Sequence, residues 1–129
     1  MPNPKQHQAK ADFNRAFLGT IDVSLYAAWA ATVAFYVAVH LVEKLRAYDN
    51  EHSTDHGDRG QFVRAKCRGI NRAYSHLYDT SLEARYKSVG GFTVSPSDVR
   101  GRLIDTYLME IEVYVAAETT ARTSGNSGS

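Results

Sequence analysis

The amino-acid sequence predicts an all-α protein, an up-and-down bundle of four to five helices. Apolar residues recur at three- and four-residue steps through most of the chain, which is the period of an amphipathic helix, and no segment alternates as a strand does. The stretch from Val23 to Val42 carries no Lys, Arg, Asp or Glu and is rich in alanine. A helix that is apolar or small on nearly all sides belongs at the centre of a bundle.

The length of 129 residues allows one domain with a hydrophobic core and leaves little room for a second. We expect the bundle to occupy residues 8–121. The tail, residues 122–129, is expected to be disordered because TSGNSGS is a low-complexity sequence.

Two helices are predicted in the first half of the chain, one over residues 8–18 and a longer one from about residue 22 to residue 47. The apolar positions of the first are Ala11, Phe17 and Leu18. The apolar positions of the second helix are expected to lie in the core together with Phe35. These positions are Leu25, Trp29, Val33, Tyr36, Val37 and Leu41.

In the second half, the polar stretch YDNEHSTDHGD predicts a loop, and apolar periodicity returns over residues 58–86 with Gly69 as a point where two helices divide. KSVGGFTV predicts a second loop. The last helix has a clear start, since Ser95 suits the N-cap and Pro96 the first helical position. Its apolar face consists of Val99, Leu103, Leu108, Ile111 and Val115.

Composition narrows the functional classes. A net charge of +1 predicts no general affinity for nucleic acid, so any electrostatic partner has to meet a local patch. The single Cys67 excludes an internal disulfide and suits a reducing cytoplasm. We expect no signal peptide, because the N-terminal residues are polar where an apolar segment would begin. Although the segment from Val23 to Val42 has the length of a membrane span, its alanines and polar residues favour a core helix. We expect a cytoplasmic protein without a membrane segment.

Three side chains suited to cleaving a phosphodiester lie within eight residues of one another: His52, His56 and Arg59. Histidine titrates near neutrality and serves as acid or base, and arginine binds phosphate through two donors. Two other interpretations stay open at this point. One is a solvated loop in which His56 or Asp58 caps the next helix; the other is a metal site that adds Asp49, Asp55 and Asp58 to the two histidines. We expect neither a metal nor a cofactor.

A basic stripe follows this loop. Five positive charges occur with no acid between Asp58 and Asp79: Arg59, Arg64, Lys66, Arg68 and Arg72. Arg64, Arg68, Arg72 and His76 recur at four-residue steps. On one unbroken helix these groups would form a track for phosphates. The alternative is a solvated basic face balanced by acids elsewhere.

Three blocks of sequence in this order resemble the HEPN superfamily of small helical-bundle proteins, and most closely a bacterial and archaeal subgroup. The blocks are an FYxAxH helix, a short loop with His and His-x-x-Arg, and a Tyr-x-x-Leu…Ser…Ala-Arg-Tyr helix. The resemblance covers roughly residues 10–118. The matching positions are Phe35, Tyr36, Ala38 and His40; His52, His56 and Arg59; and Tyr74, Leu77, Ser81, Ala84, Arg85 and Tyr86.

The resemblance implies a bundle of four to five helices, frequent dimerisation and a link to RNA or nucleotides. Many family members are metal-independent ribonucleases of toxin–antitoxin or defence modules, often paired with a nucleotidyltransferase. Catalytic members carry an Arg followed four to six residues later by a His, a spacing that Arg46 and His52 reproduce. We expect Arg85 and Tyr86 to join the nucleic-acid surface and to meet Tyr36. We expect His40 to be a hydrogen-bonded core residue.

Together these observations predict a HEPN-like protein that dimerises, through the Tyr-containing stretch 107–114, and that binds RNA or a nucleotide. Whether it is an enzyme stays open; the activity to expect would be that of a metal-independent endoribonuclease. The alternative function is that of a non-catalytic helical partner subunit of a nucleotidyltransferase or another effector.

Overall fold

The computed structural model describes residues 2–86 and 94–127, and it contains no strand within those ranges. The all-α prediction is therefore confirmed. The helices are α1 (Pro4–Thr20), α2 (Ala27–Tyr48), α3 (His56–Lys66), the 3-10 turn η1 (Arg68–Ile70), α4 (Asn71–Tyr86), the single turn α5 (Pro96–Asp98), the π-helical segment η3 (Val99–Leu108) and α6 (Met109–Ser127). The last three follow one another without a break, so the described residues form five helical rods.

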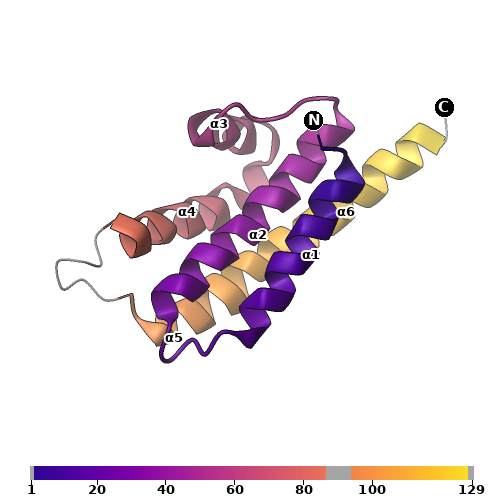
Figure 1. Ribbon diagram of the computed structural model, residues 1–129. Helices are drawn as coiled ribbons and strands as arrows, with labels where there is room; N and C mark the ends of the chain where they lie inside the picture. The colour runs from indigo at the N-terminus through magenta and orange to yellow at the C-terminus, as the bar shows by residue number, and fades with distance from the viewer. Residues whose placement is uncertain (1, 87–93, 128–129) are drawn as a thin grey trace.

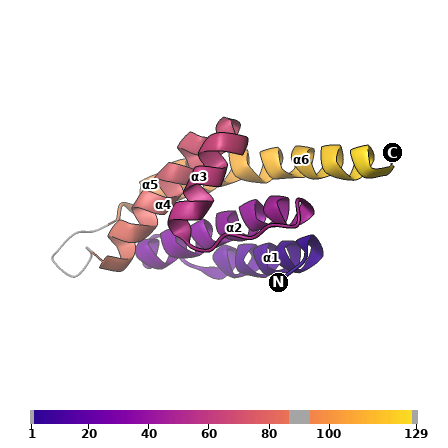
Figure 2. The ribbon, with the colours of Figure 1, turned by 90° about the horizontal axis from the view of Figure 1, so that it is seen from above.

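The alanine-rich helix α2 is the centre of the bundle. It packs against α1, α4 and the rod formed by η3 and α6 (Figure 1). Seen from above, α2 lies between α1 on one side and α4 and α6 on the other (Figure 2). Its small side chains let these neighbours approach closely, and Phe35, Val42 and Leu45 are completely buried between them.

Three large side chains that were expected in this core lie outside it. Leu25 is 72% exposed, Trp29 64% and Tyr36 36%. Leu25 precedes the helix and sits in a turn closed by the backbone carbonyl of Asp22, so it has no helical face to follow. The neighbouring helices pack on the alanine faces of α2 instead, which leaves Trp29 and Tyr36 at the rim. Phe35 and Leu41 are buried as predicted.

The first helix begins at Pro4 and not at residue 8 as expected, because side-chain hydrogen bonds cap its N-terminus. Asn3 accepts a hydrogen bond from the backbone N–H of Gln6 while the Gln6 side chain accepts one from Asn3, which closes a capping box at the beginning of α1. Ala11 and Leu18 are buried as expected, whereas Phe17 points outward and is about half exposed.

The predicted division of residues 58–86 is confirmed, although the break falls at Cys67 and not at Gly69. Cys67 leaves helical geometry, and its N–H closes the last turn of α3. Ser95 caps the final rod with Pro96 in its first turn, as predicted, and the apolar face expected for that rod is buried. Helix α6 continues to Ser127, so residues 122–127 are helical where a disordered tail was expected.

The uncharged helix has the dimensions of a membrane span but lies inside the bundle. Among the described residues α2 is the one helix long and apolar enough to cross a membrane by length and composition. Of its most apolar window, 72% is buried against the rest of the protein. Such burial is what a core helix requires; the location in the cell stays a prediction.

Candidate functional site

A cluster of aromatic rings joins α2, α3 and α4. Phe35 at its centre is completely buried, and its ring centroid lies 5.4–5.9 Å from the centroids of four others: Tyr36, His56, Tyr74 and Tyr78. His56 is the first residue of α3, held there because Asp55 caps that helix by accepting a hydrogen bond from the N–H of Asp58. The cluster therefore places the loop histidine against α2 and α4, the two helices that carry the other resemblance blocks.

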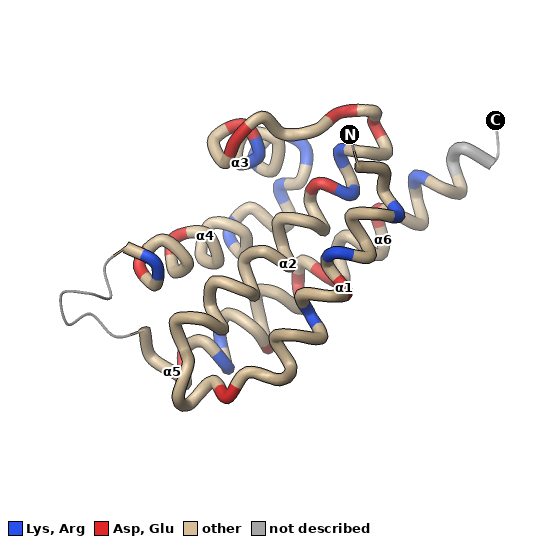
Figure 3. Tube along the Cα trace, in the orientation of Figure 1, with Lys and Arg blue, Asp and Glu red and all other residues tan. Residues whose placement is uncertain are grey.

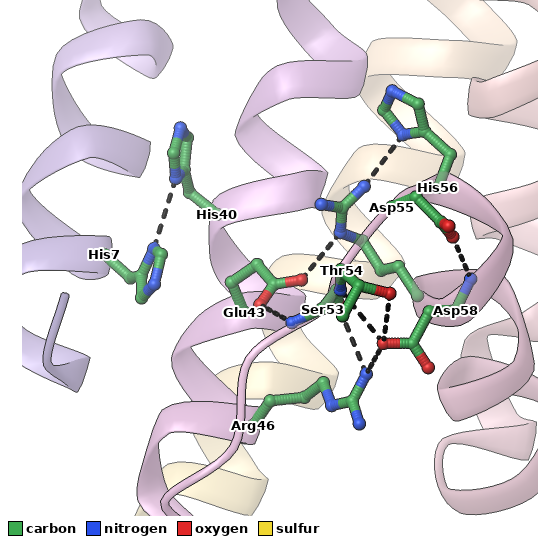
Figure 4. A network of polar contacts seen from close by, with 10 residues as sticks. His7, His40, Glu43, Arg46, Ser53, Thr54, Asp55, His56 and Asp58 are labelled. Carbon is green, nitrogen blue, oxygen red and sulfur yellow. Dashed lines mark hydrogen bonds and ion pairs between the residues drawn. The ribbon is translucent and has the colours of Figure 1, made fainter. Parts of the chain in front are cut away.

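A buried ion pair between Glu43 of α2 and Arg59 of α3 lies beside this cluster and positions His56. The Nε of Arg59 donates to a carboxylate oxygen of Glu43 at 2.8 Å, and the backbone N–H of Ser53 donates to the other oxygen at 3.1 Å (Figure 4). The two side chains are only 11% and 7% exposed. Burial by itself raises the pKa of Glu43, but the hydrogen bonds from Ser53 and Arg59 outweigh it and hold the pKa below its ordinary value. Glu43 is thus ionised and fixes the position of Arg59.

Arg59 in turn determines the hydrogen-bonding state of His56. Its guanidinium lies 2.8 Å from Nδ1 of His56. Because an arginine can only donate, this Nδ1 has to accept, and the proton of the neutral ring sits on Nε2. Burial, then the charges of Arg59 and Arg85, lower the pKa of His56. At neutral pH His56 therefore offers an N–H donor at Nε2 and no free lone pair there.

Arg46, one turn after Glu43, ties the loop to α2 and α3. Its guanidinium pairs with Asp58 at 3.1 Å and Glu51 at 3.5 Å, and it also donates to the hydroxyl of Ser53 at 3.1 Å. These contacts hold the loop that carries Ser53 against Glu43. The Arg46 side chain is engaged in this structural role, while that of His52 is exposed and makes no hydrogen bond or ion pair with other described residues.

On the far side of the cluster, Arg85, Tyr36 and Tyr86 meet as predicted. The Arg85 guanidinium lies 6.0 Å from the ring centroid of Tyr36 and 5.4 Å from that of Tyr86, and it donates to the Tyr36 hydroxyl at 3.4 Å. Tyr86 is largely exposed. Two parts of the predicted site, the His56–Arg59 pair and the Arg85–Tyr86 pair, thus border the same aromatic cluster.

The expected basic stripe is not one helical face. The chain leaves helical geometry at Cys67, so Arg64 lies on α3, Arg68 on η1 and Arg72 on α4. Two predicted members of the stripe are engaged elsewhere, since Arg59 is buried against Glu43 and His76 stacks on Tyr107. With Lys66 they form what we call the basic corner: Arg64, Lys66, Arg68 and Arg72, all exposed and without an ion pair to any described residue. Figure 3 shows Lys and Arg gathered where α3 turns into α4. The cations still lie together, but a corner and not a helix groups them.

His40 has a partner that the sequence did not reveal. Its Nδ1 lies 3.3 Å from Nδ1 of His7, which projects from α1 and is buried (Figure 4). Burial, and then the neighbouring positive charges, lower the pKa of His40 to about 4, and burial also lowers the pKa of His7. One ring of this neutral pair donates and the other accepts. His40 is therefore hydrogen-bonded, as predicted, but it is half-buried at the interface of α1 and α2 and does not lie in the core.

Glu43 was also missed, although the sequence contains a signal for it. It is the first acid after twenty uncharged residues and it continues the buried face of a core helix, and a carboxylate in that position requires a cationic partner.

As for metals, the described residues contain no group of three or more His, Cys, Asp or Glu side chains placed to hold an ion.

Comparison of the chain with protein-family models, curated proteins and solved structures gives no match. The resemblance to the HEPN superfamily thus rests on the three blocks of residues quoted above and stays a prediction.

Proposed function

We propose that this chain is a HEPN-like protein that binds single-stranded RNA or a nucleotide, and that the basic corner supplies its contacts with the phosphate backbone. The observation that carries the proposal is the set of four exposed cations within nine residues, none of them paired with an acid of the described chain. With a net charge of only +1, such a local concentration stands out against an otherwise balanced surface. Unpaired arginines suit phosphate because their planar donors engage two oxygens at once.

The site supports binding better than cleavage. A metal-free ribonuclease needs a base to take the proton of a 2′-hydroxyl. His56 carries its own proton at Nε2 because Arg59 occupies Nδ1, and His52 has no described partner that would orient it. The geometry therefore favours an RNA-binding protein in which His56 donates a hydrogen bond. Cleavage of the bound RNA by His52, His56 and Arg59 is a second and more demanding form of the proposal, because it requires a general base in addition to binding.

A titration of fluorescently labelled single-stranded RNA at low salt tests both forms. Arg68→Ala and Arg72→Ala are each expected to weaken binding across all sequences, while Arg100→Ala, an exposed arginine on the last rod, serves as the matched control and leaves it unchanged. The same samples on a denaturing gel show whether the RNA is cut and whether His56→Ala stops it. Equal affinity of the Arg68→Ala and Arg100→Ala variants would overturn the proposal.

An apolar surface supports a second function, that of a subunit in an assembly. Four large side chains of α1 and the turn that follows it are half to three-quarters exposed, and we call them the apolar face: Phe13, Phe17, Leu25 and Tyr26. At about 200 Å² per side chain they expose about 500 Å². That equals the largest patch of an ordinary monomer and supplies most of the roughly 800 Å² that each partner buries in a stable complex.

We propose that a second copy of the chain covers the apolar face. The stretch 107–114, where the sequence predicted the interface, is a poorer surface because Tyr107 is buried and stacks on His76 at 4.8 Å. Light scattering is expected to give a dimer that Phe17→Ser dissociates and that Val113→Ser, on the exposed side of the alternative stretch, leaves intact. A monomer in all three samples would contradict the dimer and leave a nucleotidyltransferase or another effector as the partner to seek.

A further inference from the structure

A cavity of about 420 Å³ lies between α2 and α4, next to the aromatic cluster. Small side chains make its floor: Ala28 and Thr32, one turn apart on α2, and Ala84 on α4. Trp29 and Tyr36 stand at its two ends, seven residues apart and thus about 10.5 Å along the helix axis. The sixth residue that lines it is Arg85. The cavity forms because the residues of α2 beside the rings of Trp29 and Tyr36 have small side chains.

Arg85 faces this cavity with donor groups to spare. A guanidinium has five N–H donors. Within the described part of the chain three of them are engaged, by the carbonyl oxygen of Ser81 at 3.2 Å, the Ser81 hydroxyl at 3.4 Å and the Tyr36 hydroxyl at 3.4 Å, and two have no acceptor there. None of the acceptors is charged. Packing near the rings of Tyr36 and Tyr86 orients the guanidinium plane without neutralising it.

From these features we infer that the cavity binds one nucleotide unit, with the base stacked on Trp29 or Tyr36 and the phosphate on Arg85. Stacking suits a flat ring of any base, and a partly exposed Trp and Tyr supply it. The two remaining donors, one on each terminal nitrogen of the guanidinium, can bind phosphate oxygens. None of the described residues that line the cavity is acidic, so none of them repels the anion.

This inference rests on the proposed function and makes it more specific. The basic corner supplies contacts that any phosphate backbone satisfies, whereas the cavity would hold a single unstacked nucleotide. The same chemistry is offered by a free mononucleotide and by a terminal or looped-out nucleotide of RNA. A mononucleotide and a short single-stranded RNA therefore form the two arms of the test.

Trp29 is the sole tryptophan of the chain, so its fluorescence reports directly on the cavity. We expect AMP to quench it in a saturable manner, excited at a wavelength that the base does not absorb. Adenosine, which lacks the phosphate, and the variant Arg85→Ala are each expected to show a dissociation constant for this quenching at least tenfold higher. Arg85→Lys restores part of the affinity, and Arg100→Ala has no effect.

A second variant tests the cavity without touching a charge. Ala28→Leu places a larger side chain on the floor and is expected to abolish quenching by AMP, while the far-UV circular dichroism of the variant shows that it is folded. Tyr36→Ala is expected to weaken AMP binding, and Tyr36→Phe to preserve it.

The outcomes separate this inference from the proposed function. Quenching by AMP that depends on Arg85 and not on Arg68 supports the cavity as a nucleotide site, and the same Arg85 dependence with the short RNA shows that RNA enters it. RNA binding that depends on Arg68, with no Arg85-dependent quenching by either probe, overturns the cavity inference and leaves the proposed function standing. No binding of either probe overturns both.

Discussion

The ion pair between Glu43 and Arg59 offers a quantitative test of how the site is held. Both side chains are almost completely buried, and the carboxylate accepts hydrogen bonds from Arg59 and from the backbone of Ser53. Removing one member of such a pair leaves a buried charge and costs about 3–5 kcal/mol. Glutamine at position 43 retains one acceptor oxygen, so we expect Glu43→Gln to lower the free energy of unfolding by about 2–3 kcal/mol.

Replacing Arg59 by Met is expected to cost about 3–5 kcal/mol because the carboxylate then lacks its cation. The double variant Glu43→Gln, Arg59→Met removes both charges, and its loss should fall short of the sum of the two single losses by about 2–3 kcal/mol. Urea unfolding followed by circular dichroism measures these differences, as shifts of about 1–2 M in the midpoint for the single variants.

The chain contains a matched control for this experiment. Arg15 and Glu112 join α1 to α6 at 3.2 Å, but their side chains are 36% and 32% exposed. Glu112→Gln is therefore expected to change the stability by less than about 1 kcal/mol. Losses that simply add in the double variant, or a Glu43→Gln variant as stable as Glu112→Gln, would refute the argument that Arg59 and His56 are positioned by a buried carboxylate.

Three further perturbations test other parts of the structure. The pKa of His40 is lowered from 6.5 to about 4, so the unfolded chain binds a proton that the folded protein does not. The stability that the neutral ring contributes is therefore complete above pH 6.5 and is lost as the pH drops toward 4. The loss is on the order of 1–2 kcal/mol because the ring is partly exposed. Chemical denaturation of wild type and His40→Asn across this range should show a flatter profile for the variant. Asp55→Ala removes the N-cap of α3 and is expected to cost about 1 kcal/mol in the same assay, whereas Asp55→Asn retains most of the stability. Phe35→Ala removes the ring at the centre of the aromatic cluster and is expected to cost about 3–5 kcal/mol, and a loss below 1 kcal/mol would show that the cluster is not a packed core.

The helices could be predicted from the sequence because their signals are local. Apolar periodicity locates each rod, and Ser95 with Pro96 marks the start of the last one. The same periodicity misplaced Trp29 and Tyr36, because a helix with small residues on several faces can be covered from any of them. The faces of α2 that become buried depend on the sequences of the helices that pack against it.

The candidate site was predicted in its parts but not in its assembly. His56, Arg59 and Arg85 were identified from the sequence, yet what joins them is a carboxylate on another helix, Glu43, and a ring, Phe35, that was expected only to fill the core. Contacts between residues far apart in the chain carry no periodic signal. The break at Cys67 likewise turned a predicted stripe into a corner, since the spacing of the arginines does not reveal a change of helix direction.

The salt dependence of RNA binding tests the central claim most directly. If all four cations of the basic corner contact phosphates of a single strand, the slope of log affinity against log salt concentration should be about −2.8, and Arg68→Ala should reduce its magnitude by about 0.7. Arg100→Ala should leave the slope unchanged. A slope near zero, or one that Arg100→Ala flattens and Arg68→Ala does not, would contradict the claim that this corner binds the RNA backbone.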